Sequence, residues 1–169
     1  MKSIFTSESH DVYQTVTGSV VVHDRYPNSA VVLALHKGHM VVIRQYREGI
    51  GTYAYELPGG AVEPAEDPLE AAQRELLEET GLFARDLTPL ATIQSCGHLT
   101  NETAHLFFAA ETVIQAPQHL DADEAIQVSL HTIPEALHQI VVGTWKNPEL
   151  AHAVLLALLH GHIRRSGLD

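Results

Sequence analysis

The sequence predicts an α/β fold in which a mixed β-sheet is sandwiched between helices, an α/β/α sandwich. Stretches rich in β-branched residues dominate the first 110 positions, one well-bounded helical stretch interrupts them, and two more helical stretches follow near the end. With 169 residues and 45% apolar composition, the chain has the size and apolar content of one globular domain. We therefore expect a single domain over residues 1–169, with 1–17 as an N-terminal extension.

The expected strands are bounded by turn residues. Residues 19–25, 30–36 and 39–46 are separated by Pro27-Asn28-Ser29 and Lys37-Gly38, which indicates a meander of three strands. The segment 48–52 contains two glycines and is expected to be a loop. Further strands are expected at 53–57, 87–95, 103–111 and 126–131.

The helix expected at 67–81 has a signal at each end. Asp67 can cap its first turn, Pro68 suits its first helical position, and Gly81 suits the left-handed position that ends a helix. Two further helices, 134–142 and 148–160, each have proline in the first turn. The face of the first helix that we expect to pack on the sheet carries Leu69, Ala72 and Leu76.

The charge balance excludes several classes of partner. Ten Lys and Arg face 21 Asp and Glu, for a formal net charge of −11, and no basic stripe is visible. Binding to DNA or to a membrane surface is therefore not expected. The longest apolar run, 153–159, is too short to span a bilayer, and the N-terminus shows no secretory signal. The single cysteine fits a reducing compartment, so we expect a cytoplasmic protein.

The acidic residues concentrate between positions 56 and 79, where Arg74 is the single base. On a helix, Glu75, Glu78 and Glu79 are neighbours, and like charges at that spacing repel. Arg74 can reach Glu78 and relieve part of the repulsion, and a divalent cation would relieve the rest. A solvated acidic helix face is the alternative interpretation of these four residues alone.

A longer pattern encloses this helix. The residues Gly60-x5-Glu66-x7-Arg74-Glu75-Leu76-x-Glu78-Glu79-x-Gly81-Leu82 resemble the Nudix box over its full 23 residues. Upstream, Leu57-Pro58-Gly59-Gly60 takes the chain from a strand into a loop whose backbone can approach another group closely.

The resemblance implies a Nudix fold and a magnesium-dependent hydrolase that cleaves a nucleoside diphosphate linked to another group. Mn²⁺ would be a substitute metal. The implied metal ligands are the side chains of Glu75, Glu78 and Glu79 and the carbonyl of Gly59. Arg74 would orient the glutamates, and Gly60 and Glu66 would brace the loop.

Segments outside the box resemble the branch of the family that cleaves ADP-ribose and other nucleoside diphosphate sugars. They are Arg44-Gln45-Tyr46-Arg47, Tyr55-Glu56-Leu57-Pro58-Gly59-Gly60 and Ser95-Cys96-Gly97. Cys96 departs from the proline usual there in ADP-ribose enzymes, so the identity of the sugar stays open. The resemblance implies substrate contacts for Arg44, Arg47, Tyr55, Glu56 and His98, with core packing as the alternative for Tyr55. Glu102 flanks the same loop as His98.

A general base is expected from a late loop, as in several relatives. Glu124 is the best positional match, and a solvated acidic loop is the alternative for it. Two other functions compete with the first. One is a house-cleaning hydrolase of nucleoside triphosphates, dinucleoside polyphosphates or RNA 5′ ends, and the other is a non-catalytic ADP-ribose-binding regulatory module. Related sugar-nucleotide enzymes are commonly homodimers that use N-terminal strands, and the strand-forming stretch 12–22 would permit that arrangement here.

Overall fold

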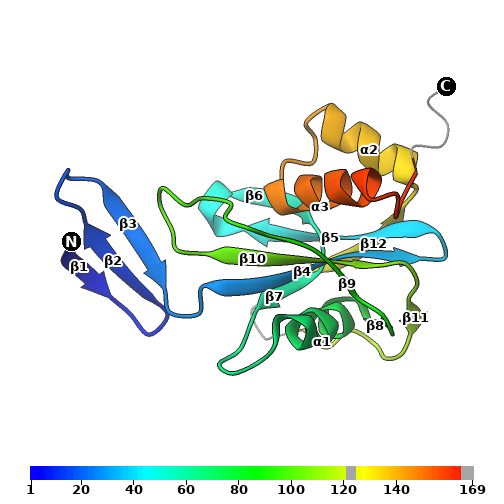
Figure 1. Cartoon of the computed structure of the whole chain (residues 1–169), viewed down its shortest axis with the longest axis horizontal. Coiled ribbons are helices and arrows are strands. Elements are labelled where there is room, and N and C mark those ends of the chain that lie inside the picture. Colours follow the sequence, from blue (N-terminus) through cyan, green and yellow to red (C-terminus); the bar gives the residue numbers. More distant parts are fainter. Residues whose placement is uncertain (121–124, 165–169) are drawn as a thin grey trace.

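The body of the protein is a mixed sheet with helices on both faces (Figure 1). The computed structural model describes residues 1–120 and 125–164, and within them the main sheet has seven strands. Five strands follow in the order β12-β5-β4-β10-β9, while β6 pairs with β5 and β7 pairs with β4. The strands β4 and β10 are parallel, and the other pairs are antiparallel. Their bounds are β4 (Asn28–His36), β5 (His39–Arg47), β6 (Thr52–Glu56), β7 (Gly59–Ala61), β9 (Thr88–Ile93), β10 (Thr103–Ala109) and β12 (Gln127–His131).

The two faces of this sheet carry separate apolar cores, which confirms the predicted sandwich. One core lies between the sheet and two helices, α2 (Ile133–Val141) and α3 (Pro148–Leu159), and includes Leu33, Leu106 and Leu150. The other lies under α1 (Pro68–Thr80) and includes Val32 and Leu76. Successive strand residues point to opposite faces, so alternate residues of β4 and β10 supply both cores.

Helix α1 has the ends that the sequence predicts. The Asp67 carboxylate accepts a hydrogen bond from the Leu69 amide at 2.8 Å, and Pro68 opens the helix. Gly81 ends it at φ 72°, a conformation that glycine adopts without steric cost. One expectation is wrong: Leu69 is 37% exposed in the first turn, while Ala71 and Ala72 are fully buried. Two small side chains bring the helix close to the sheet there.

The expected meander of 19–25 with 30–36 is also wrong. Strand β3 (Val20–Asp24) pairs with β2 (His10–Gln14), which pairs with β1 (Lys2–Thr6). These three strands form a separate antiparallel sheet, drawn in blue beside the body in Figure 1. The reason is that β4 is already paired on both edges, with β10 on one side and with β5 and β7 on the other.

Smaller elements lie where loops were expected. A 3-10 turn, η1 (Glu48–Ile50), follows β5, and β8 (Leu82–Phe83) pairs with β11 (Val113–Ile114). The glycines expected to leave the sheet as a loop instead form β7 against β4. In the part of the chain that the structure describes, each helix is too short or too polar to cross a membrane.

Candidate active site

The site is built where β7 meets α1. The Gly59 amide donates a hydrogen bond to Glu79 Oε2 at 2.7 Å, and Glu79 is only 2% exposed. A side chain at position 59 would collide with the Ala30 carbonyl oxygen and would lie 2.8 Å from Val31 Cα. At Gly60, a Cβ would lie 2.5 Å from Glu75 Oε1. Both glycines are therefore required by close approach, the first to strand β4 and the second to a carboxylate of the helix.

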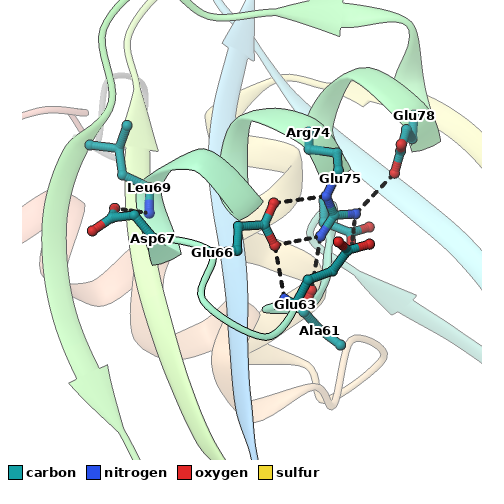
Figure 2. A network of polar contacts seen from close by, with 8 residues as sticks. All are labelled: Ala61, Glu63, Glu66, Asp67, Leu69, Arg74, Glu75 and Glu78. Carbon is teal, nitrogen blue, oxygen red and sulfur yellow. Dashed lines mark hydrogen bonds and ion pairs between the residues drawn. The ribbon is translucent and has the colours of Figure 1, made fainter. Parts of the chain in front are cut away.

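Arg74 lies at the centre of a network of carboxylates (Figure 2). Its Nε and Nη2 donate to the two oxygens of Glu66 at 2.9 and 3.0 Å, and Nη2 also donates to the Ala61 carbonyl at 3.0 Å. Its Nη1 donates to Glu75 Oε1 at 2.7 Å and to Glu78 Oε2 at 3.0 Å. One guanidinium thus ties the loop after β7 to two glutamates of α1.

The same contacts shift the pKa of Glu66 and the pKa of Arg74. Hydrogen bonds from Arg74 hold the pKa of Glu66 below its usual range, and the Glu63 amide, which donates to Glu66 Oε2 at 2.9 Å, acts in the same direction. The carboxylates of Glu66, Glu75 and Glu78 raise the pKa of Arg74 against the opposing effect of burial. Arg74 is therefore a permanent cation, and Glu66 stays ionised well into the acidic range.

Replacing Glu66 with glutamine is expected to lower the free energy of unfolding at neutral pH by about 1.5 kcal/mol, because two charge-assisted hydrogen bonds are weakened. The folded pKa of Glu66 is lowered from 4.5, so its contribution is complete above that pH and is lost as the pH falls through the folded pKa. Denaturant melts of the wild type and Glu66→Gln should therefore differ at pH 7 and converge near pH 2. An equal difference at both pH values would contradict this role.

The donor set of α1 suits a hard divalent cation. Glu75, Glu78 and Glu79 offer carboxylate oxygens from one helix, and Mg²⁺ prefers oxygen ligands. Their side chains do not yet converge, since no group of three His, Cys, Asp or Glu within residues 1–120 and 125–164 is arranged to hold a metal. Arg74 Nη1 donates to both Glu75 and Glu78. By residue type the site fits the metal.

Three cavities open beside this site. The first, of about 280 Å³, is bordered by Gly59, Gly60 and Arg47. The second, of about 980 Å³, lies between the β5–β6 hairpin and the start of α3, and it shares Arg47 with the first. A third, of about 290 Å³, is bordered by Gly60 and by Arg74, Glu75 and Glu78. The box residues are thus accessible from more than one direction.

Arg47, which borders the first two cavities, is paired with Glu56, which borders the second. Arg47 Nη2 donates to Glu56 Oε2 at 2.7 Å, and Gln45 donates to the same oxygen at 3.0 Å. Burial acts to lower the pKa of Arg47, but the hydrogen bond and charge of Glu56 outweigh it, and the pKa is raised overall. Asn147, at the start of α3, reaches Glu56 Oε1 at 3.4 Å. Arg47 therefore keeps its charge at a position that borders both cavities.

The remaining substrate residues predicted from the sequence lie in different places. Tyr55 borders the second cavity, and its ring stacks on Trp145 with centroids 5.5 Å apart. Arg44 lies 3.8 Å over the ring of Tyr53 and borders none of the three cavities. His98 is exposed near Cys96 and borders none of them either. Glu124 lies outside the residues that the structure describes.

Sequence reasoning missed Glu149, on the first turn of α3. Its carboxyl borders the first cavity, and Ser95 Oγ donates to its Oε1 at 3.0 Å. Burial raises the pKa of Glu149, and the nearby charges of Glu56 and Glu102 act in the same direction. The first turn of a helix is a common place for glutamate, so the sequence carries no signal that this one borders a cavity beside β7.

Comparisons with known proteins agree with this geometry. The family model of the NUDIX domain matches residues 25–151. The chain is 30% identical over 132 residues to the ADP-ribose pyrophosphatase of Bacillus subtilis (strain 168), covering 77% of this chain and 71% of that protein. It is 28% identical over 141 residues to the ADP compounds hydrolase NudE of Escherichia coli (strain K12), covering 81% and 69%.

A solved structure, described as the crystal structure of ADP compounds hydrolase, superposes with a TM-score of 0.78. The match covers 96% of this chain and 94% of that one, at 20% sequence identity, and it supports the fold. The family match spans the main sheet, α1 with its complete box, and the start of α3. The chain belongs to the Nudix family of pyrophosphohydrolases, enzymes that cleave phosphoanhydride bonds.

Proposed function

We propose that the protein hydrolyses the pyrophosphate bond of a nucleoside diphosphate sugar, with ADP-ribose as the first candidate. The products would be a nucleoside monophosphate and a sugar phosphate. The observation that carries the proposal is the close approach of Gly59 to Glu79 and of Gly60 to Glu75, beside a cavity of about 280 Å³ that shares Arg47 with a second one of about 980 Å³. The similarity to an ADP-ribose pyrophosphatase and to an ADP compounds hydrolase supports this branch of the family.

Nudix hydrolases typically use a divalent metal, and we propose Mg²⁺ for this one, with Mn²⁺ as a substitute. Glu75, Glu78, Glu79 and the carbonyl of Gly59 would hold it. When bound, the metal would neutralise charge on the pyrophosphate and lower the pKa of the attacking water. The protein contributes the placement: the amide of Gly59 fixes Glu79, and Arg74 keeps Glu75 and Glu78 close to the loop.

The substrate contacts are proposed from the cavities. Arg47 would contact a phosphate or ribose oxygen, because a guanidinium matches such oxygens. Glu56 and Tyr55 would also contact the bound nucleotide. Glu56 would accept a hydrogen bond from a sugar hydroxyl. Arg44 and His98 border none of the three cavities and remain proposed substrate contacts on the family resemblance alone. Glu124 remains the proposed general base on the family resemblance alone.

The test is a panel of nucleoside diphosphate sugars, nucleoside triphosphates, dinucleoside polyphosphates and 5′-triphosphorylated RNA, each incubated with the protein and Mg²⁺. Release of a nucleoside monophosphate and a sugar phosphate from the first group is the expected result. Release of inorganic pyrophosphate from triphosphates or RNA would instead indicate a house-cleaning hydrolase. Tight binding of ADP-ribose without any cleavage would indicate a regulatory module.

We further propose that residues 1–169 act as one Nudix domain in a cytoplasmic homodimer, with residues 1–17 in the dimer contact. Strand β1 is exposed along its whole length, and Ile4 and Phe5 are 50% and 60% exposed. A protruding sheet with apolar side chains in solvent is typical of an interface. Sedimentation equilibrium of the full chain should give twice the monomer mass, and a monomer at micromolar concentration would contradict the proposal.

A further inference from the structure

The cavity of about 280 Å³ borders β7, and Arg74 is not among its lining residues. Gly59, Gly60, Glu149 and Ser95 all border it. A substrate whose pyrophosphate lies against Gly59 and Gly60 would therefore extend one of its two ends into this cavity. The lining of the cavity then determines which end it accepts.

The charged lining is mostly negative. Among the described residues that border the cavity, the charged side chains are Asp24, Glu102, Glu149 and Arg47. Arg47 is already paired with Glu56, so its charge is largely compensated. A terminal phosphate entering this space would meet carboxylates of the same charge.

Two of the three carboxylates, those of Glu149 and Glu102, can accept further hydrogen bonds. Both oxygens of Asp24 are used, by the Tyr26 amide and by His10. In contrast, Glu149 accepts from Ser95 through Oε1, and Oε2 receives no hydrogen bond from any described residue. Glu102 accepts a hydrogen bond from Thr100 through Oε2, and its Oε1 likewise receives none from any described residue. Each carboxylate can accept several hydrogen bonds, so both can bind donors of a ligand.

Glu149 is also held in a fixed position. The side chain of Asn147 caps α3 by accepting from the Leu150 amide at 2.8 Å, which places Glu149 in the first helical turn. The Ser95 hydroxyl then fixes one carboxylate oxygen from the loop after β9. An acceptor held from two separate elements is preorganised, so a ligand does not need to order it.

We propose that this cavity is the subsite for the uncharged, polyhydroxylated end of the substrate, and that Glu149 and Glu102 accept hydrogen bonds from its hydroxyls. This subsite rests on the proposed function and explains how the site would select its substrate. A sugar donates hydroxyl protons to carboxylates, whereas a terminal phosphate has only acceptors and carries the same charge as the walls. The two glutamates thereby favour a nucleoside diphosphate sugar over a nucleoside triphosphate.

The test compares kcat/KM for ADP-ribose and for ATP, with Mg²⁺, in the wild type, Glu149→Gln and the control Glu111→Gln. Glu111 is exposed and borders none of the three cavities, so the control makes the same charge change elsewhere. Glu149→Gln is expected to reduce the preference for ADP-ribose over ATP by roughly tenfold or more, with a higher KM for ADP-ribose, because a charge-assisted hydrogen bond is lost and repulsion is relieved. The control should keep the wild-type ratio.

The outcomes separate the inference from the function on which it rests. A wild type that cleaves ADP-ribose, together with a Glu149→Gln ratio within twofold of the control, would overturn the subsite and leave the proposed function intact. A wild type that cleaves no nucleoside diphosphate sugar would overturn both. If Glu149→Gln melts below the assay temperature, Glu102→Gln takes its place, because Glu102 is exposed and tolerates substitution. An unchanged ratio in that variant would also reject the subsite.

Discussion

Glu79→Gln is expected to lose roughly a thousandfold in kcat while keeping its fold, because metal ligation contributes several kcal/mol to the transition state of phosphoanhydride hydrolysis. The amide oxygen of glutamine can still accept the hydrogen bond that Gly59 donates to Glu79 at 2.7 Å. The contact between loop and helix therefore survives, and only the negative charge is removed. Steady-state turnover of ADP-ribose with Mg²⁺ measures the loss, and a thermal melt by circular dichroism measures the fold.

The matched control is Glu70→Gln. Glu70 lies in the first turn of the same helix and is exposed, so its substitution makes the same charge change away from the Gly59 contact. Its turnover should stay within about twofold of the wild type, since surface substitutions have small effects. Calorimetric titration with Mg²⁺ should show weaker binding to Glu79→Gln than to Glu70→Gln. Equal turnover in both variants would exclude Glu79 from metal binding.

The part of the site that the sequence predicted is the part encoded within one short stretch. The bounds of α1 depend on Asp67, Pro68 and Gly81, which act on adjacent backbone and were read from spacing alone. The contacts of Arg74 with Glu66 and Glu78 also lie within eight residues of chain, so the box pattern located them. Local interactions of this kind do not depend on the rest of the fold.

The features that sequence reasoning missed depend on distant parts of the chain. The sequence predicts strand β3 beside β4, but both edges of β4 are occupied by strands from later in the sequence. Strand β3 pairs instead with β2, which precedes it in the chain. Glu149 joins the cavity wall because α3 packs on the sheet next to Ser95, which no spacing in the sequence expresses. The partners of a strand or of a cavity wall are set by topology, so propensity and periodicity do not identify them.

The two glycines of β7 are expected to respond differently to the same substitution. At Gly59, an alanine Cβ would meet the backbone of β4, namely the Ala30 carbonyl and Val31 Cα, and backbone in a central strand cannot yield cheaply. Gly59→Ala should therefore lower the free energy of unfolding by about 3 kcal/mol, or roughly 10 °C in Tm. Gly49→Ala is the control for stability, because a Cβ there meets nothing within 4 Å.

At Gly60, the obstacle is the end of a flexible side chain, since the added Cβ would lie 2.5 to 2.7 Å from the Glu75 carboxylate atoms. Glu75 can turn away at little cost, so Gly60→Ala should melt within a few degrees of the wild type. The carboxylate would then leave its place beside the loop, and turnover of ADP-ribose should fall by roughly a hundredfold. In Gly60→Ala the turnover would fall while the melting temperature is kept, whereas in Gly59→Ala the stability itself falls. The two variants therefore distinguish a glycine that makes room for a ligand side chain from one that holds β7 on the sheet. Wild-type turnover in Gly60→Ala would show that the position of Glu75 does not matter to the reaction.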